Sequence, residues 1–532
     1  MISERFRQSM GWLHTWLGIA LSAVLFAVFW TGTLTVFDKE IDQWMKPELR
    51  IASADNVSLD SLVLQRVATF DTGPDSVIWI GPPRDRQSVI RLFYDDAAGE
   101  SHEELIDPHN GKLIKPTDSD AGEFFFRFHF MLHLPDGIGY YVVGLAALGM
   151  MILIISGIFI HRKIFQEFFT FRPKKRARRA VLDFHNLTGV IALPFHFLIP
   201  FSGLLILATT YLPWSMGVPY QGDLKQLRTD QLGYEERKIE PAGVPGGAIA
   251  AIDRYRDRAE AIWRSEEGRA SSSAEWIAIF NPKDANAYVM IERYFPDRRV
   301  AIGPDQLTFD LRSGDIIGRF APQPVNYVNN WIEGLHWIQF DHWPLRWLYF
   351  LAGLSGCAMI GSGLLFWIEA RLSKGRMDPA SVRVVRAISI GSITGIIVAT
   401  CAFLIANRLL PKVIGFTDVP RHEIEIGIFF GTWFMTFAHA ALRRKKAWRD
   451  QSIFIAVGAG AAVLLNWLTT GMHPVAAIDG AIWPVAAMDA LLLGGAAFAV
   501  LAARRLGRSG QGAVTDPARP REESDIAAGQ AV

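Results

Sequence analysis

The chain has 532 residues, of which 50% are hydrophobic and 20% are charged. A formal net charge of +1 provides no basic excess of the kind that a nucleic-acid-binding protein needs. The two cysteines both lie in apolar runs, which argues against a disulfide framework or a thiolate metal site. Many apolar runs are about 20 residues long, enough for a helix to cross a bilayer. These totals predict an integral membrane protein.

Eight apolar segments predict eight membrane-spanning helices. They cover residues 11–37, 139–161, 183–211, 345–368, 387–407, 424–442, 452–470 and 482–503. Lysine and arginine collect at the N-terminus, after the second, fourth and sixth segments, and at the start of the tail. Cytoplasmic loops of membrane proteins carry such an excess. We therefore expect a multi-pass protein of the bacterial inner membrane, with both termini in the cytoplasm and the large loops in the periplasm.

Two long hydrophilic segments each combine a helical pattern with β-rich runs, and each contains a D-x-x-x-G turn. The turns are Asp107–Gly111 and Asp310–Gly314, where Asp suits the first turn position and Gly supplies a positive φ. Both turns therefore predict hairpins. The expected order is a first span (1–37), an α+β domain (38–138), two spans joined by a basic loop (139–211), a second α+β domain (212–343), a fourth span (344–372), four additional spans (373–508) and a disordered tail (509–532).

The first and third spans share a pattern that indicates an internal duplication. His14 and His185 are each followed four residues later by Gly, and a hydroxyl-Gly pair follows at the same distance in both spans. Leu-His dipeptides, containing His133 and His336, precede the second and fourth spans, which both contain Ser-Gly near their ends. Repeated helix–domain–helix units pointing the same way are related by an axis along the membrane normal.

Histidine is costly inside a membrane and is the commonest metal ligand. The axis would pair His14 with His185 near the cytoplasmic face and His133 with His336 near the periplasmic face, so that each pair can ligate a haem iron. Haem with both axial positions filled transfers electrons. A lone histidine at a helix end is ordinarily an interface residue, so repetition of the pattern carries this prediction. Three weaker candidates for the same irons are His129, His161 and His196.

The sequence shows no site for NAD or flavin. Its glycine clusters do not lie between a strand and a helix, as a dinucleotide-binding turn requires. The predicted cytoplasmic loops are too short for a flavin domain. If electrons come from the cytoplasmic side, we expect a membrane quinol or another protein to deliver them.

Several motifs together resemble the PepSY-associated transmembrane proteins, a family that includes inner-membrane ferric-siderophore reductases. They are LHTWLGI near the N-terminus, the DPHNGK turn, LDFHNLTG, and the two Leu-His dipeptides. The resemblance covers about the first 370 residues. It implies two PepSY-type domains on a four-helix core, one or two haem b groups, and an oxidoreductase that reduces the ferric iron of a siderophore. The matching haem-ligand positions are His14, His133, His185 and His336.

Two other classes of function stay open at this stage. Helix-anchored PepSY-type domains without redox chemistry suit the binding of peptide or cell-wall material. A parallel repeat with four additional spans suits a transporter. We expect membrane lipid but no nucleic acid as a partner, and the sequence leaves open whether the chain forms a homodimer.

Overall fold

A computed structural model of the chain describes residues 3–512 with internal gaps. The gaps are 55–56, 74, 136, 162–176, 213, 215–217, 219, 224–225, 227–238, 248, 250, 268–272, 294–299, 301–304, 321–323, 341, 373–378, 416, 444–445 and 481. Most of the predicted basic loop after the second span lies outside the described residues, and so does the predicted disordered tail from residue 513 onward.

The described part contains seven helices long and apolar enough to cross a membrane, and a bent pair of helices that makes an eighth if it is taken as one span. The chain is therefore a polytopic helical membrane protein. The spans are α1 (Glu4–Thr35), α6 (Ile138–Ile160), the pair α7 (Ala177–Ile191) and α8 (Leu193–Ile206), α14 (Trp343–Leu372), α15 (Pro379–Ile390) continuing through the π-helical turn η2 (Gly391–Gly395) into α16 (Ile396–Leu409), α17 (Arg421–Arg443), α18 (Ala447–Thr470) and α20 (Trp483–Gly512).

The third span is bent, whereas a single run over 183–211 was expected. The axes of α7 and α8 meet at 64° around Ala192. Pro194, in the first turn of α8, has no backbone N–H to continue the α7 ladder. The residue that leaves helical geometry at the break is Ala192, with φ −110° and ψ 23°. The bend therefore has a local cause in the sequence.

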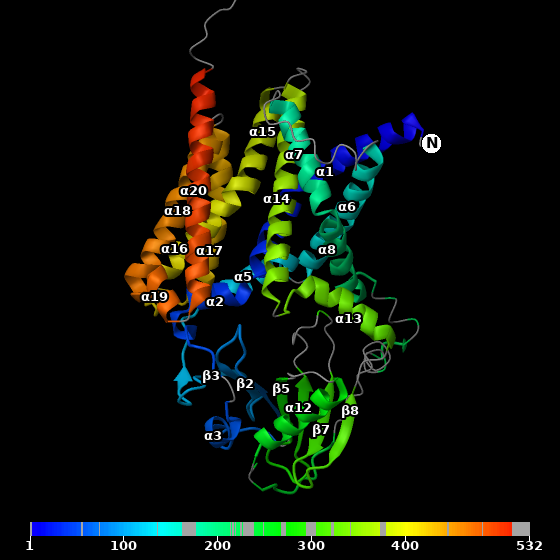
Figure 1. The fold of residues 1–532 in the computed structure, drawn as a ribbon, viewed down its shortest axis with the longest axis vertical. Coiled ribbons are helices and arrows are strands. Elements are labelled where there is room, and N and C mark those ends of the chain that lie inside the picture. The colour runs from blue at the N-terminus through cyan, green and yellow to red at the C-terminus, as the bar shows by residue number, and fades with distance from the viewer. Residues whose placement is uncertain are drawn as a thin grey trace, which may run out of the picture.

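The strands of both hydrophilic segments form one antiparallel sheet at one end of the helices, in the order β4-β3-β2-β1-β5-β6-β7-β8 (Figure 1). The centre of the sheet is the pair β1–β5, in which Ile78 is opposite Ile279. Three further strands lie on each side of this pair. The strands are β1 (Val77–Gly81), β2 (Ile90–Asp95), β3 (Ser101–Ile106), β4 (Leu113–Ile114), β5 (Ala274–Phe280), β6 (Tyr288–Arg293), β7 (Gln306–Asp310) and β8 (Ile316–Phe320).

Both predicted hairpins are confirmed. Gly111 has φ +70° between β3 and β4, and its N–H donates to the Asp107 carbonyl over 2.9 Å. Gly314 has φ +77° between β7 and β8, and its N–H donates to the Asp310 carbonyl over 3.0 Å. The two halves of the sheet thus repeat the same turn at corresponding places.

Short helices cover one face of the sheet. α3 (Leu59–Leu62) and α4 (Leu64–Val67) come from the first segment, and α12 (Asp253–Glu267) comes from the second. Their apolar side chains share one core with the strands, and Trp263 is fully buried in it. The halves also cap each other, because Asp253 accepts from the Leu59 N–H over 3.0 Å and Asp60 accepts from the Asp253 N–H over 3.1 Å.

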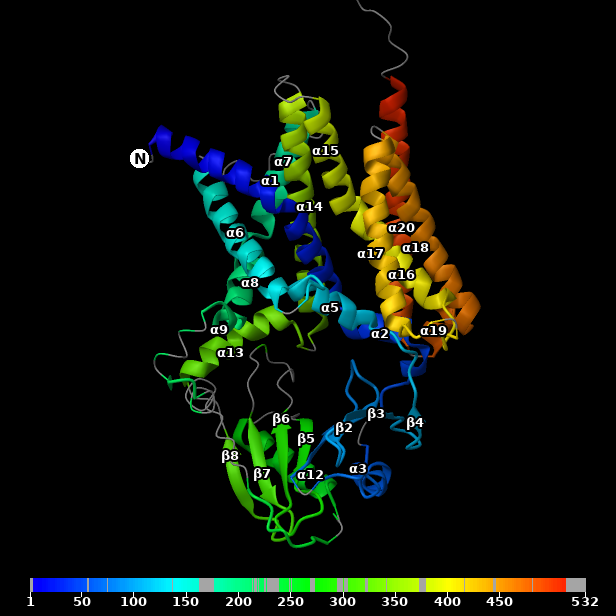
Figure 2. The same ribbon diagram turned by 180° about the vertical axis from the view of Figure 1, so that it is seen from behind.

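Several elements lie between the helical bundle and the sheet in both views (Figures 1 and 2). They include α2 (Asp38–Met45), α5 (Ala121–Met131) and α13 (Pro324–Trp337), and the remaining short elements are η1 (Pro47–Leu49), α9 (Ala208–Tyr211) and α19 (Pro474–Asp479). We call this end of the helices the sheet side and the opposite end the far side.

The helices from α15 onward stand beside the core formed by α1, α6, α7, α8 and α14 (Figure 1). Phe124, Phe125 and Phe128 of α5 are buried and contact phenylalanines of α16 and α17. These rings therefore join the two groups of helices, while Trp331 and Trp337 of α13 are exposed.

Polar contacts join the same two groups of helices. The indole of Trp30 donates to Thr400 over 3.0 Å, and that of Trp44 donates to Asp489 over 2.7 Å. The buried acid Asp489, in the last span, is thus a hydrogen-bond acceptor for α2.

A buried charge cluster fixes the sheet to the helices. Arg86, in the β1–β2 loop, donates to Asp38 over 2.9 Å and to both carboxylate oxygens of Glu40 over 2.9 Å each. Arg346 of α14 lies 3.7 Å from Glu40. Burial opposes ionisation of Asp38, but the charges of Lys39, Arg86 and Arg346 lower its pKa to about 2. The Asp38 carboxylate therefore stays charged, and with Glu40 it holds the arginine from the sheet.

We predict that Arg86→Ala destabilises the attachment of the sheet by about 3–5 kcal/mol, because it leaves two buried carboxylates without their main partner. Arg91→Ala is the matched control, since Arg91 and Glu103 form a more exposed ion pair whose loss costs at most about 1 kcal/mol. Thermal unfolding combined with limited proteolysis of the sheet checks this. Equal stability of the two variants would contradict it.

A second prediction concerns Glu292 of β6. Burial, and then the nearby charge of Glu275, raise its pKa to about 7 from 4.5. The folded protein therefore binds more protons than the unfolded chain between these values, so its stability falls as the pH rises through that window. Glu292→Gln removes this fall. The melting temperature of the variant should therefore rise relative to that of the wild type between pH 4.5 and about pH 7, and the difference should stay constant above that. A constant difference in melting temperature would show that Glu292 does not titrate as described.

Candidate cofactor-binding site

Two histidines face each other toward the far side of the core. His14 of α1 and His185 of α7 have ring centroids 6.4 Å apart and ring planes at 81°. Nδ1 of His14 lies 2.9 Å from the Leu153 carbonyl of α6, and Nδ1 of His185 lies 2.8 Å from the Met359 carbonyl of α14. The two rings thus make the same contact with two different helices.

A second pair faces each other toward the sheet side. His129 of α5 and His336 of α13 have ring centroids 6.0 Å apart and ring planes at 36°. Nδ1 of His129 lies 2.8 Å from the Val28 carbonyl of α1, and Nδ1 of His336 lies 3.0 Å from the Ile199 carbonyl of α8. All four imidazoles therefore make one kind of hydrogen bond.

This hydrogen bond assigns the tautomer of each ring. A backbone carbonyl only accepts, so each Nδ1 carries the hydrogen and each Nε2 of the neutral ring keeps its lone pair. Within the described chain, none of the four Nε2 atoms makes a hydrogen bond. Each of them also keeps some accessible surface, because none belongs to the buried polar atoms that lack a partner. Burial lowers the pKa of His129 and takes that of His336 to about 3, which keeps these rings neutral. Neutral imidazoles with an available Nε2 are the form that binds metals.

A glycine beneath each histidine ring lets the ring come close to the backbone of the neighbouring helix. Each accepting carbonyl lies four residues before a glycine, the pairs being Val28/Gly32, Leu153/Gly157, Ile199/Gly203 and Met359/Gly363. A Cβ on Gly32 would lie 2.6 Å from Cε1 of His129, and one on Gly203 would lie 2.9 Å from Cε1 of His336. The corresponding distances are 3.3 Å at Gly157 and 3.1 Å at Gly363. The hydroxyl-Gly pairs of the sequence are thus the places where histidine rings rest.

The hydroxyl groups of these pairs differ in what they contact. Ser156 lies 3.1 Å from Nδ1 of His14, and Ser202 lies 3.0 Å from Nδ1 of His336. Thr31 and Ser362 instead donate to carbonyls of their own helices. Each facing pair therefore contains one ring with a hydroxyl neighbour and one ring without.

The predicted partnership of His133 with His336 is corrected by the structure, which places His129 beside His336. Leu132 and His133 follow the end of α5 with φ of 53° and 52°, and this left-handed turn carries the His133 ring toward Phe430, 5.5 Å away. The number of residues between each histidine and the Ser-Gly glycine of the following span already indicates His129 as the equivalent of His336. His336 precedes Gly363 by 27 residues (363 − 336), and His129 precedes Gly157 by 28 (157 − 129), against 24 for His133 (157 − 133).

The other two candidates lie apart from the pairs. Nε2 of His161 lies 2.9 Å from the Asn186 amide nitrogen, at the end of α6. His196 is 0% exposed within the core and contacts Phe29 of α1, so it belongs to neither facing pair. Asp183, beside His185 in sequence, is ion-paired with Arg179 over 3.0 Å.

The four histidines fit the ligand requirements of haem. A bond between imidazole nitrogen and metal is about 2 Å long, so two rings on opposite sides of one iron have centroids on the order of 6 Å apart. Both facing pairs match that separation. Metal-ligating histidines commonly donate their other ring N–H to a carbonyl, as all four do here. His14 and the ring site at Gly32 are 18 residues apart on α1, or about 27 Å, so the pairs lie near opposite ends of the span.

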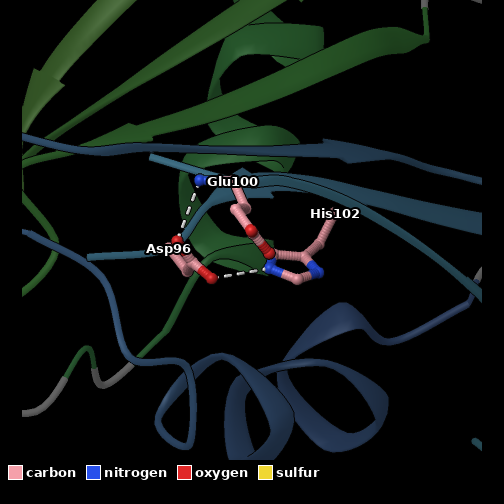
Figure 3. Close-up of side chains that lie close together, drawn as sticks. All are labelled: Asp96, Glu100 and His102. Atoms are coloured by element: carbon pink, nitrogen blue, oxygen red, sulfur yellow. Dashed lines mark hydrogen bonds and ion pairs between the residues drawn. The ribbon is translucent and has the colours of Figure 1, made fainter. Parts of the chain in front are cut away.

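A different cluster of metal-type ligands lies at the tip of the β2–β3 hairpin (Figure 3). Nε2 of His102 lies 2.9 Å from one carboxylate oxygen of Asp96, and the N–H groups of Ala98 and Glu100 donate to the other over 2.9 Å each. Asp96 thus closes the hairpin turn. These contacts give the cluster a structural role.

Comparison with known proteins agrees with this architecture. The PepSY-associated TM region family matches residues 11–370. The chain belongs to this family. The match begins in α1 and ends within α14, so the PepSY-associated region includes both histidine pairs and the sheet. A Pseudomonas aeruginosa protein described as uncharacterized is 25% identical over 290 residues, which are 52% of this chain and 69% of that protein.

We predict that Gly32→Ala destabilises the protein by about 1–3 kcal/mol, because the new methyl group overlaps the His129 ring. Gly11→Ala on the same helix is the control, since no atom lies within 4 Å of its added Cβ. Melting temperatures of the purified variants check this. If Gly11→Ala costs as much as Gly32→Ala, ring contact is not the cause.

Proposed function

We propose that this chain is a haem b-containing electron-transfer protein of the bacterial inner membrane that reduces ferric siderophores at the sheet side, which we assign to the periplasm. The observation that carries the proposal is the fourfold repetition of one contact, an imidazole Nδ1–H on a carbonyl above a glycine, which produces two facing pairs with available Nε2 atoms. We also propose that the two halves derive from one duplicated helix–PepSY domain–helix unit, with the domain limits expected from the sequence.

The chain's own residues would hold one haem at each pair. His14 and His185 would ligate the far-side iron, and His129 and His336 the sheet-side iron, while the carbonyls of α1, α6, α8 and α14 fix the ring orientations. Bound haem would supply one-electron chemistry, and an iron held by two imidazoles would leave no place for substrate to bind it. The substrate would therefore accept its electron from outside the histidine pair.

The direction of electron flow follows from the assigned orientation. A quinol in the membrane or a protein at the far side would donate one electron at a time, and Fe(III) in a siderophore on the sheet side would accept it and become Fe(II). Siderophores hold Fe(III) far more tightly than Fe(II), so one electron releases the metal. The exposed aromatic residues of α13, Trp331 and Trp337, lie on the helix that carries His336, where lipid or an apolar part of the substrate would contact them.

We predict two haems per purified chain, measured by the pyridine haemochrome spectrum. His129→Ala and His336→Ala should each remove the same haem, and the double variant should lose no more than either single variant. His14→Ala and His185→Ala should remove the other haem. His133→Ala is the matched control and should keep both.

Two outcomes would contradict different parts of the proposal. Retention of haem in His129→Ala together with loss in His133→Ala would restore the pairing expected from the sequence. A chain that binds no haem when produced with ample haem would end the redox proposal and favour a non-redox role of the PepSY domains. With haem bound, ferric siderophore added at the sheet side of proteoliposomes should reoxidise the reduced protein and yield Fe(II) to an Fe(II)-specific chelator.

A further inference from the structure

His196 is a buried imidazole that neither histidine pair uses. It lies on α8, four residues after the break that separates α8 from α7, and is 0% exposed. Its Nε2 is 3.4 Å from the Ala352 carbonyl of α14, at the long limit of a hydrogen bond. Its Nδ1 has no hydrogen-bond partner in the described chain. An enclosed, unpaired ring nitrogen is costly, so it calls for a functional explanation.

Two backbone carbonyls lie close to the ring of His196. The carbonyl of Gly189, near the end of α7, lies near the ring, and the Ala352 carbonyl of α14 lies 3.4 Å from its Nε2. A neutral imidazole donates one hydrogen bond and an imidazolium donates two. Carbonyls near a helix C-terminus also carry partial negative charge, which favours a cation there. The two oxygens therefore match the protonated ring better than the neutral ring.

The described groups that face His196 include no carboxylate and no other cation. They are Phe29 of α1, Phe195 of α8, the Gly189 carbonyl of α7, and Ala352 and Gly356 of α14. The titratable group next to Gly356 is Cys357, a buried thiol that interacts with Thr33 of α1. A proton on His196 would therefore have no neighbouring charge to balance it within the chain as described.

His196 lies midway between the two histidine pairs. On α8 it precedes Gly203, beneath the sheet-side ring of His336, by seven residues (203 − 196). On α14 its neighbour Gly356 precedes Gly363, beneath the far-side ring of His185, by seven residues (363 − 356). Each interval corresponds to about 10 Å of helix. A charge at His196 would act on both pairs through the low-dielectric core.

We propose that His196 is a proton-binding site that takes up one proton when an electron enters the helical core and releases it when the electron leaves. This inference rests on the proposed function, because the electron resides at the haem-binding pairs. The balance is one electron from the donor, which would reside at a histidine pair, and one proton from water, which turns neutral His196 into its imidazolium. When Fe(III) outside the protein accepts the electron, the proton returns to water, so the core gains no net charge in either state.

Redox titration of the haem-loaded chain tests the proposal, with the potential followed by the visible spectrum between about pH 5 and 8, where histidine titrates. The wild-type potential of at least one haem should fall as the pH rises, by at most about 59 mV per tenfold change in proton activity for one electron. His196→Gln should keep both haem spectra and lose this slope. His439→Gln, on α17 outside the core, is the matched control and should keep it.

A second measurement observes the proton itself. The reduced-minus-oxidised infrared spectrum of protein labelled with ¹⁵N-histidine should contain an imidazolium band that is absent from His196→Gln. Wild-type potentials that are independent of pH, or a slope that His196→Gln leaves unchanged, would overturn the proposal. These outcomes presuppose bound haem, so they are distinguishable from failure of the proposed function, in which no haem spectrum exists to titrate.

Discussion

The arrangement depends on bringing an imidazole ring against the backbone of a helix whose carbonyls are already hydrogen-bonded. An ordinary side chain at the contact would hold the ring away, and a Cβ at Gly32 would come within 2.6 Å of it. Glycine therefore decides where each ring rests, and the carbonyl four residues earlier decides how it turns. The same contact, a ring on a glycine with its Nδ1–H donating to the carbonyl four residues earlier, occurs on α1, α6, α8 and α14. It orients both pairs of rings in the same way.

Much of this arrangement follows from the sequence, because its signals are local. Apolar length predicts the spans, D-x-x-x-G predicts the hairpins, and equal spacing in two helices identifies His14 and His185 as equivalent. The partner of His336 is different. His129 and His133 lie one helical turn apart and project from the same face of a continuing helix. Only the left-handed turn at Leu132, which ends α5 between them, separates their directions.

The packing role of the last four spans also could not be predicted from a sequence pattern. The phenylalanines of α5 suit an interfacial aromatic belt by composition, yet Phe124 and Phe128 are buried against α17. The acid of α20 is explained by the indole of Trp44, more than 400 positions earlier in the chain. Such contacts join segments without a shared motif, so they become visible only when the helices are placed together.

The antiparallel pairing of β1 with β5 has a mechanical consequence. The helices of the two halves are connected to opposite halves of one hydrogen-bonded sheet. Arg86 fixes this sheet to the charged residues that follow α1. Rocking one half against the other, as alternating-access carriers do, would have to shear the central strands or break that anchor. The shared sheet thus makes the helical core rigid, which would keep the distance between the two histidine pairs constant.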